Sequence, residues 1–177
     1  MASVAQTLKE KIRQVPDFPK PGILFYDITT LLRDPEGFRT AIDVLMAPYR
    51  QSGIDLVVAV ESRGFILGAA VADRLGAGFV PVRKVGKLPA RTVRATYQLE
   101  YGTDSLEMHE DAVVPGQRVL VVDDVLATGG TARATVDLVK GRGGEVCGVA
   151  FLVELAFLNG RSKLAGEDVF TALQYAE

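Results

Sequence analysis

The stretch Arg118-Val-Leu-Val-Val-Asp-Asp-Val-Leu-Ala-Thr-Gly-Gly-Thr131 decides the expected fold of this chain. Its residues 119–122 form a continuous aliphatic run, which is typical of a strand buried on both faces of a parallel sheet. An amphipathic helical pattern begins after the glycines, with Ala132, Val136 and Val139 on one stripe. The sequence therefore predicts a strand, a tight turn and a helix in direct succession, as in an α/β fold.

The predicted turn has the properties of an anion site. Gly129 and Gly130 let the backbone approach a phosphate closely, and the helix start offers free N–H groups and the positive end of the helix dipole. Thr128 and Thr131 can add hydroxyl donors. We therefore expect residues 127–131 to bind a phosphate group.

Two adjacent carboxylates, Asp123 and Asp124, precede this turn. Carboxylates repel phosphate, but they suit the hydroxyl groups of a ribose. Successive side chains of a strand point to opposite faces, so both acids can serve one ligand only if the strand ends before them. The expected ligand is a ribose 5-phosphate; the alternative is a plain strand–turn–helix joint with solvent-facing acids.

Composition and length exclude several classes of protein. A chain of 177 residues with 48% hydrophobic and 24% charged residues is expected to be one globular domain. A net charge of −2 disfavours a nucleic-acid polymer as partner. The single cysteine, Cys147, lies in an apolar run and is expected to be a core residue. No run is long enough to cross a membrane and no signal-peptide pattern is present, so we expect a cytoplasmic protein.

Two further strand ends carry groups suited to a diphosphate. A buried strand at 55–60 leads into a turn and a helix at 65–75, and another strand at 78–83 leads into a basic turn. Ligand sites in open α/β sheets lie at the carboxyl ends of strands, although plain surface charges are the alternative. Glu61 is expected to hold Arg63 or a residue of an opposite subunit. The candidate diphosphate ligands are Ser62, Arg63, Arg83, Lys84 and Lys87.

Two other segments are expected to cover the site. Residues 91–110 alternate polar and apolar side chains, which predicts a two-stranded excursion too polar to be core, and such excursions often act as lids. Residues 3–15 show helical spacing up to Pro16. Prolines and a glycine then favour a rigid extended segment ending in aromatic residues, with Phe25 either covering a ligand or filling core.

The motif at residues 121–131 resembles the phosphoribosyl-diphosphate (PRPP) binding motif of type I phosphoribosyltransferases. Further matches, from about residue 15 to Tyr175, narrow the resemblance to those that act on adenine. The matching segments are Phe18-Pro-Lys-Pro-Gly-Ile-Leu-Phe-Tyr-Asp-Ile28, Ser62-Arg-Gly-Phe65 and Leu99-Glu-Tyr-Gly102. The resemblance implies a single α/β domain over 1–177. It implies a mostly parallel central sheet flanked by helices, a small hood at about 16–30 and a flexible lid at about 84–110.

The resemblance also implies roles at the base. Phe25 would stack on the purine, and Glu100 would act as the catalytic acid near N7 when the lid, with Tyr101, closes. Ala127 stands where phosphoribosyltransferases for 6-oxopurines usually carry a carboxylate. The other residues implied for adenine are Leu24, Tyr26, Leu126 and Leu155.

The implied reaction is transfer of phosphoribose from PRPP to adenine, giving AMP and diphosphate. Arg63 would act as a catalytic residue on the leaving group. Mg²⁺ would be bound mainly through PRPP, with no direct protein ligand, and a homodimer is expected. Two alternatives remain open from the residues: a PRPP-sensing regulator that keeps this fold, and an enzyme for another base such as xanthine or uracil.

Overall fold

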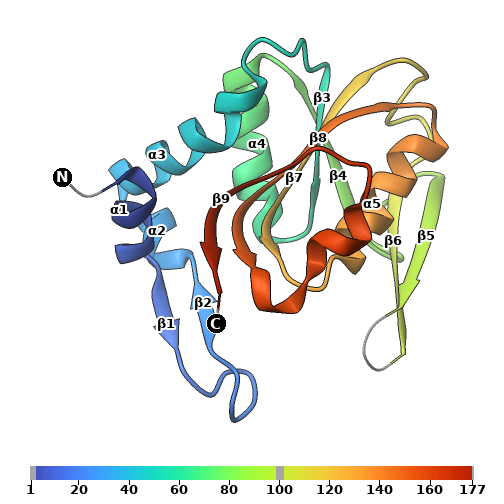
Figure 1. Ribbon diagram of the computed structural model, residues 1–177. Helices are drawn as coiled ribbons and strands as arrows, with labels where there is room; N and C mark the ends of the chain where they lie inside the picture. The colour runs from blue at the N-terminus through green and yellow to red at the C-terminus, as the bar shows by residue number, and fades with distance from the viewer. Residues whose placement is uncertain (1–2, 99–101, 177) are drawn as a thin grey trace. The chain divides into compact units, whose positions relative to one another are not determined.

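The computed structural model describes residues 3–98 and 102–176 of the chain. The chain divides into two compact units, Met1–Val44 and Leu45–Glu177 (Figure 1). The larger unit contains a seven-stranded sheet in the order β5-β6-β4-β3-β7-β8-β9. Its strands are β3 (Leu56–Val60), β4 (Gly78–Lys84), β5 (Thr92–Gln98), β6 (Thr103–His109), β7 (Arg118–Leu126), β8 (Glu145–Leu155) and β9 (Val169–Tyr175).

Five of these strands, from β4 across to β9, pair in parallel, as the aliphatic runs predict. The helices α4 (Arg63–Leu75) and α5 (Gly130–Gly141) connect them and pack on the sheet (Figure 1). Gly68 of α4 lies against Ala59, whereas the neighbouring Val58 belongs to the core that contains Val136 of α5. Because adjacent strand residues face opposite sides, α4 and α5 cover opposite faces of the sheet.

The central strand β7 is longer than predicted. It continues through Asp123 and Asp124 to Leu126, in register with β8. Both acids were expected to serve one ligand only if the strand ended before them, and it does not end there. Within the strand, the backbone N–H of Asp124 donates to the Asp123 carboxylate at 2.9 Å and Arg63 pairs with Asp124.

The excursion at 91–110 forms an antiparallel hairpin, β5 and β6, and β6 pairs with β4. The hairpin therefore extends the main sheet. Leu106 and Met108 of β6 are fully buried, so the expectation that the excursion is too polar to be core is wrong for this face. Glu107, which lies between these two residues in the sequence, is buried as well. It accepts hydrogen bonds from the Gly86 amide at 3.0 Å and from Arg94 at 2.9 Å.

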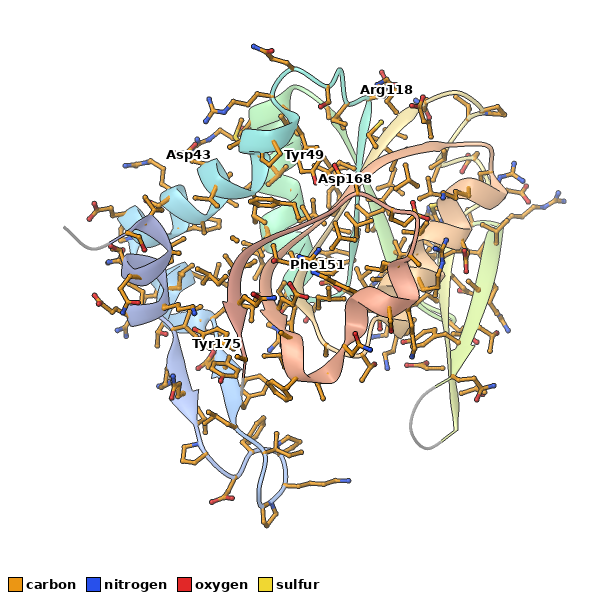
Figure 2. The ribbon with its side chains drawn as sticks, in the orientation of Figure 1. Asp43, Tyr49, Arg118, Phe151, Asp168 and Tyr175 are labelled. Atoms are coloured by element: carbon orange, nitrogen blue, oxygen red, sulfur yellow. The ribbon has the colours of Figure 1, made fainter. Side chains whose placement is uncertain are left out.

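The core of the larger unit is aliphatic, with Phe151 of β8 among its largest fully buried side chains (Figure 2). Tyr49 is buried as well, and its ring packs where a side chain at residue 148 would otherwise lie, because that residue is glycine. Burial and then the charge of Asp168 raise the pKa of Tyr49. Cys147 is only half-buried, not a full core residue, and burial raises the pKa of its thiol.

Short 3-10 turns complete this unit: η1 (Ala47–Tyr49), η2 (Ala156–Leu158) and η3 (Gly160–Leu164). Glu154 at the end of β8 is buried and forms a two-point ion pair with Arg161 of η3, at 2.8 and 3.0 Å. Thr171 of β9 donates to the same carboxylate at 2.9 Å. This network fixes η3 against the sheet.

The smaller unit contains α1 (Val4–Glu10), a hairpin of β1 (Arg13–Val15) and β2 (Phe25–Asp27), α2 (Thr29–Arg33) and most of α3 (Pro35–Met46). The helix expected over 3–15 ends early, because residues 13–15 pair with 25–27 instead. Asp27 stabilises this pairing by accepting a hydrogen bond from Arg13 Nε at 3.1 Å. Within the described residues of both units, none of the helices has the length and apolar character needed to span a bilayer.

Candidate active site

The predicted phosphate turn follows β7 directly. Gly129 has φ +79°, a conformation that favours glycine, and it precedes the first residue of α5. Residues 123 and 125–132 line a cavity of about 90 Å³ at this point. The backbone N–H groups at the start of α5 therefore meet a hollow that is large enough for part of a phosphate-bearing ligand.

The 3-10 turn η3 packs directly against this loop. A Cβ on Gly129 would collide with the carbonyl oxygen of Gly160, and a Cβ on Gly160 would collide with the carbonyl oxygen of Ala127. The two backbones therefore touch without side chains between them. The ion pair of Glu154 with Arg161 holds η3 in this position.

The two carboxylates after residue 122 lie beside the first turn of α4. Asp123 lines the phosphate cavity, and its carboxylate fills the space that a side chain at Gly64 would occupy. Asp124 is buried, and its Oδ2 lies 2.6 Å from Nε of Arg63. The structure thus brings Asp123 to the cavity directly and links Asp124 to the candidate diphosphate loop.

The surroundings of Asp123 disfavour its charged form. Burial, followed by the neighbouring charge of Asp124, raises the pKa of Asp123 well above its usual value. The amide of Asp124 and the charge of Arg63 oppose this rise. A buried carboxyl group with a perturbed pKa is typical of functional sites.

The candidate diphosphate cations gather around one carboxylate. Glu61 accepts from the Lys84 amide at 2.6 Å and pairs with Arg83 and Lys87, each at 3.2 Å. Burial opposes ionisation of Glu61, but the Lys84 amide and the two cations outweigh it and lower its pKa. The sequence left Glu61 to hold either Arg63 or a residue of an opposite subunit; the structure pairs Glu61 with Arg83 and Lys87, and it pairs Arg63 with Asp124.

The remaining diphosphate candidates lie nearby. Ser62 is exposed and precedes α4, without a side-chain cap. Lys84 also uses its ammonium group, which pairs with Asp104 of β6 at 2.9 Å. The structure therefore places Arg83, Lys84 and Lys87 together at the carboxyl end of β4.

The predicted base-binding residues belong to both units. In the smaller unit, Leu24 is exposed, Tyr26 is buried, and Phe25 makes an edge-to-face contact with Phe18 at 5.1 Å. In the larger unit, Leu126 and Leu155 end β7 and β8. Leu126 is buried in the core, whereas Leu155 is half-buried. Their joint contact with adenine stays a prediction. Glu100 and Tyr101 lie outside the described residues.

Sequence reasoning missed two residues beside the phosphate turn. The Thr131 hydroxyl donates to the Tyr97 hydroxyl at 3.3 Å, and Tyr97 donates to Asp104 at 3.3 Å. The alternation along β5 contains the signal for Tyr97, because Val93, Ala95 and Tyr97 share the face that packs on the core. The partner Asp104 was not predictable without the strand register.

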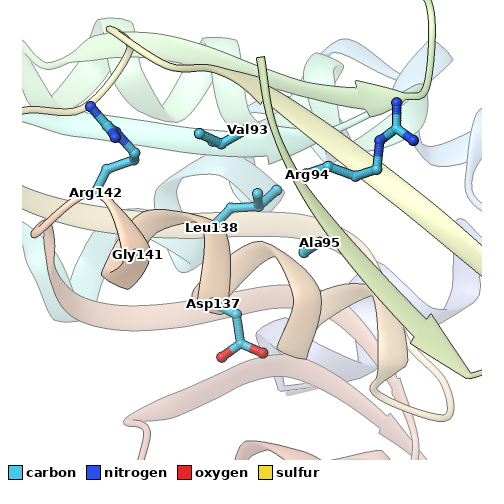
Figure 3. Close-up of a pocket in the computed structure, with 7 residues that line it drawn as sticks. All are labelled: Val93, Arg94, Ala95, Asp137, Leu138, Gly141 and Arg142. Atoms are coloured by element: carbon cyan, nitrogen blue, oxygen red, sulfur yellow. The ribbon is translucent and has the colours of Figure 1, made fainter.

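A second cavity, of about 190 Å³, lies between β5 and α5 (Figure 3). In the close-up, Arg94 and Arg142 extend away from Leu138 in different directions. None of the predicted site residues lines this cavity, so it is separate from the candidate active site. The lining residues are Val93, Arg94, Ala95, Asp137, Leu138, Gly141 and Arg142.

Comparisons with known proteins agree with the geometry. Residues 28–172 match the phosphoribosyl transferase domain family. The adenine phosphoribosyltransferase of Acidobacterium capsulatum is 63% identical over 172 residues, which cover 97% of this chain and 95% of the relative.

Solved structures show the same fold. The crystal structure of the enzyme from Rhodothermus marinus superposes with a TM-score of 0.93 at 58% identity, covering 97% of this chain and 98% of that one. The enzyme from Saccharomyces cerevisiae, in complex with an imino-altritol bisphosphate and adenine, gives 0.91 at 45% identity, with coverage of 98% and 100%. The chain therefore belongs to the phosphoribosyltransferase family and, within it, to the adenine phosphoribosyltransferases.

Proposed function

We propose that this chain transfers the 5-phosphoribosyl group of PRPP to N9 of adenine, giving AMP and diphosphate. The observation that carries the proposal is the cavity at the start of α5, lined by the backbone of 127–131 and by the carboxylate of Asp123. An anion site next to an acid suits a phosphorylated sugar better than a free phosphate, because the acid accepts hydrogen bonds from sugar hydroxyls and repels a second anion.

The sugar must be held rigidly while its C1′ exchanges partners. The 5′-phosphate is assigned to residues 127–131, with Thr128 as a hydroxyl donor and Thr131 as a backbone N–H donor. The ribose hydroxyls are assigned to Asp123, which lines the cavity, and Asp124 is assigned to the same site through its ion pair with Arg63, because the strand continues through both acids. Two fixed attachment points on one sugar remove much of its freedom before the reaction, which lowers the entropic part of the barrier.

Departure of diphosphate leaves positive charge on the sugar ring and negative charge on the leaving group. Ser62, Arg63, Arg83, Lys84 and Lys87 are assigned to the diphosphate. In the structure, Arg83 and Lys87 share Glu61, and Arg63 pairs with Asp124. These cations are therefore already oriented by acids before substrate arrives, which reduces the reorganisation needed to stabilise the developing charge.

Mg²⁺ fits this site as an ion carried by the substrate. Among residues 3–98 and 102–176, no cluster of three or more His, Cys, Asp or Glu side chains could hold a metal ion. Asp123 and Asp124 are the residues whose hard oxygen acceptors would lie beside an ion brought in by PRPP. When bound, the ion would neutralise charge on the leaving diphosphate.

Adenine is assigned to Phe25, with Leu24, Tyr26, Leu126 and Leu155 completing its surroundings. Ala127 cannot exchange a proton with the base, so Glu100 is assigned as general acid at N7 and Tyr101 as part of the lid. Residues 84–110 would exclude water, because hydrolysis of PRPP competes with transfer. The chain is proposed to act in the cytoplasm, as a homodimer, in purine salvage.

A nucleobase panel tests this assignment. The purified chain is incubated with PRPP, Mg²⁺ and, in separate reactions, adenine, hypoxanthine, guanine, xanthine and uracil, and nucleotide formation is measured. We expect AMP from adenine and no product from the other bases. Product from a 6-oxopurine or uracil would overturn the substrate assignment, and tight PRPP binding with no product from any base would indicate a PRPP sensor.

A further inference from the structure

A continuous chain of polar contacts links the phosphate turn to the candidate diphosphate site. It starts at Thr131 in the first turn of α5, whose hydroxyl donates to Tyr97 of β5 at 3.3 Å. Tyr97 donates to Oδ2 of Asp104 on β6, also at 3.3 Å. The same oxygen accepts from the ammonium group of Lys84, at the end of β4, at 2.9 Å.

The middle of this chain is well fixed. Asp104 Oδ1 accepts from the Ser105 amide at 2.8 Å, so both carboxylate oxygens are occupied. Tyr97 and Asp104 are direct partners in the β5–β6 register. The Tyr97 ring packs on the phosphate turn, where a Cβ on Gly130 would lie 3.0 Å from the ring. Rotation of Tyr97 would therefore break its contacts with Thr131 and Asp104. Rotation of Asp104 would break its contacts with Tyr97, Lys84 and Ser105.

The end of the chain at Lys84 retains capacity for a ligand. An ammonium group has three donors, and Asp104 uses one of them. The Lys84 side chain is 60% exposed, so its ion pair with Asp104 adds little to folding stability. The contact matters because it fixes the position of the Lys84 ammonium group. A lysine side chain without such a contact occupies many rotamers and loses that freedom on binding.

We propose that Tyr97 and Asp104 are positioning residues that couple the two anionic ends of PRPP. The inference rests on the proposed roles of residues 127–131 and of Lys84. A 5′-phosphate held by the backbone N–H of Thr131 leaves the Thr131 hydroxyl on Tyr97, and therefore orders Tyr97, then Asp104, and finally the ammonium group that meets the diphosphate. Neither Tyr97 nor Asp104 needs to touch the reacting atoms.

Binding of the two halves of the substrate tests this coupling. The affinity of the full chain for diphosphate with Mg²⁺ is measured by calorimetry, with and without saturating ribose 5-phosphate. In the wild type, we expect ribose 5-phosphate to tighten diphosphate binding by about fivefold, the size of one hydrogen bond. In Tyr97→Phe and in Asp104→Asn, the tightening should fall below about twofold. Tyr97→Phe keeps the ring on Gly130 and removes only the hydroxyl.

Thr96→Val is the matched control. Thr96 and Ser105 share a side-chain hydrogen bond of 2.8 Å in the same hairpin, outside the polar chain. This variant should retain the full coupling. The proposal is overturned if the wild type shows no coupling, if Tyr97→Phe and Asp104→Asn both retain it, or if Thr96→Val loses it as well.

Kinetics separate this proposal from the proposed function. Tyr97→Phe and Asp104→Asn should both still form AMP from adenine, with the KM for PRPP raised about fivefold and the KM for adenine unchanged. The double variant Tyr97→Phe/Asp104→Asn should have the same KM for PRPP as each single variant, because each substitution already breaks the same chain of contacts. Additive losses would overturn the relay while leaving the transferase assignment intact; absence of AMP in the wild type would overturn the transferase assignment itself.

Discussion

At the scale of single residues, Asp123 shows the conflict between binding and stability. Asp123 lines the cavity that we assign to the sugar, yet burial and the adjacent Asp124 disfavour its charge. The raised pKa means that the folded chain keeps this proton at pH values where the unfolded chain has released it. The contribution of Asp123 to stability is therefore highest below its unfolded pKa and falls as pH rises.

Asp123→Asn should accordingly stabilise the free protein and remove its activity. The amide keeps an oxygen for the Asp124 N–H bond and removes the buried charge. We expect Tm at pH 8 to rise by about 3 °C, which corresponds to roughly 1 kcal/mol for a chain of this size. The difference should shrink as pH falls toward about 4, where the unfolded carboxyl also protonates. Calorimetric melting across pH measures it.

Asp111→Asn is the control for this experiment, because Asp111 is an exposed acid outside the site. Its Tm should follow the wild type at every pH. A Tm of Asp123→Asn that equals or falls below that of the wild type at pH 8 would contradict a buried, disfavoured charge at residue 123.

Glu100 is the residue on which the proton assignment depends. Residues 127–131 contain no acidic side chain that could exchange a proton with the base. Glu100→Ala should lower kcat by at least about tenfold while the Kd for PRPP stays the same, because general acid catalysis contributes in the transition state. Steady-state rates with adenine and PRPP measure this, and a wild-type kcat would remove Glu100 from the mechanism.

At the scale of elements, the unit of β7, its turn and α5 was predictable because hydrophobic periodicity and glycine placement agree there. The end of β7 was not, since two charged residues in sequence normally indicate solvent. Long-range partners keep Asp123 and Asp124 within the strand: Arg63 of α4 pairs with Asp124 from a distant part of the sequence, and the space at Gly64 is created by the packing of α4 on β7. Such contacts follow from topology, which local patterns do not contain.

The contact of the phosphate turn with η3 yields a test at this scale. Gly129→Ala places a methyl group against the Gly160 carbonyl and forces a positive φ on alanine. We expect binding of ribose 5-phosphate to weaken by at least about tenfold, since strain of 1–2 kcal/mol or more must be relieved by moving the turn. Isothermal titration with ribose 5-phosphate measures the loss.

Gly141→Ala provides the comparison within the same helix. A Cβ at residue 141 meets nothing within 4 Å. This variant should bind ribose 5-phosphate as the wild type does and gain up to about 1 kcal/mol of stability from the better helix former. Equal binding by Gly129→Ala and Gly141→Ala would show that the turn tolerates a side chain and that its backbone is not the phosphate site.

At the scale of the whole molecule, family membership and the parallel sheet followed from the sequence, whereas the arrangement around the site did so only in part. The cations Arg83, Lys84 and Lys87 were correctly grouped, because they follow one strand end. Their common partner Glu61 was not predicted, since it follows a neighbouring strand whose position beside β4 comes from the sheet order. The hairpin β5–β6 buries one of its faces, although the alternation of polar and apolar residues predicted an excursion too polar to be core.

The assembly of the whole molecule is the last prediction. We expect size-exclusion chromatography with light scattering to give twice the chain mass of 19.0 kDa at micromolar concentration. The mass should be independent of PRPP and adenine, because the resemblance implies a dimer before substrate binds. A monomeric mass across the concentration range used for kinetics would remove the dimer from the proposed function.

The half-buried Cys147 has a practical consequence for studying motion in this protein. It is the one cysteine in the sequence, and burial keeps its thiol protonated to higher pH than usual. Maleimide reagents attack the thiolate, so an exposed cysteine introduced by mutation should be alkylated faster than Cys147 near neutral pH. A fluorophore placed in this way on β5 or β6 would report movement of the hairpin in single-molecule recordings. Cys147 would not have to be substituted first.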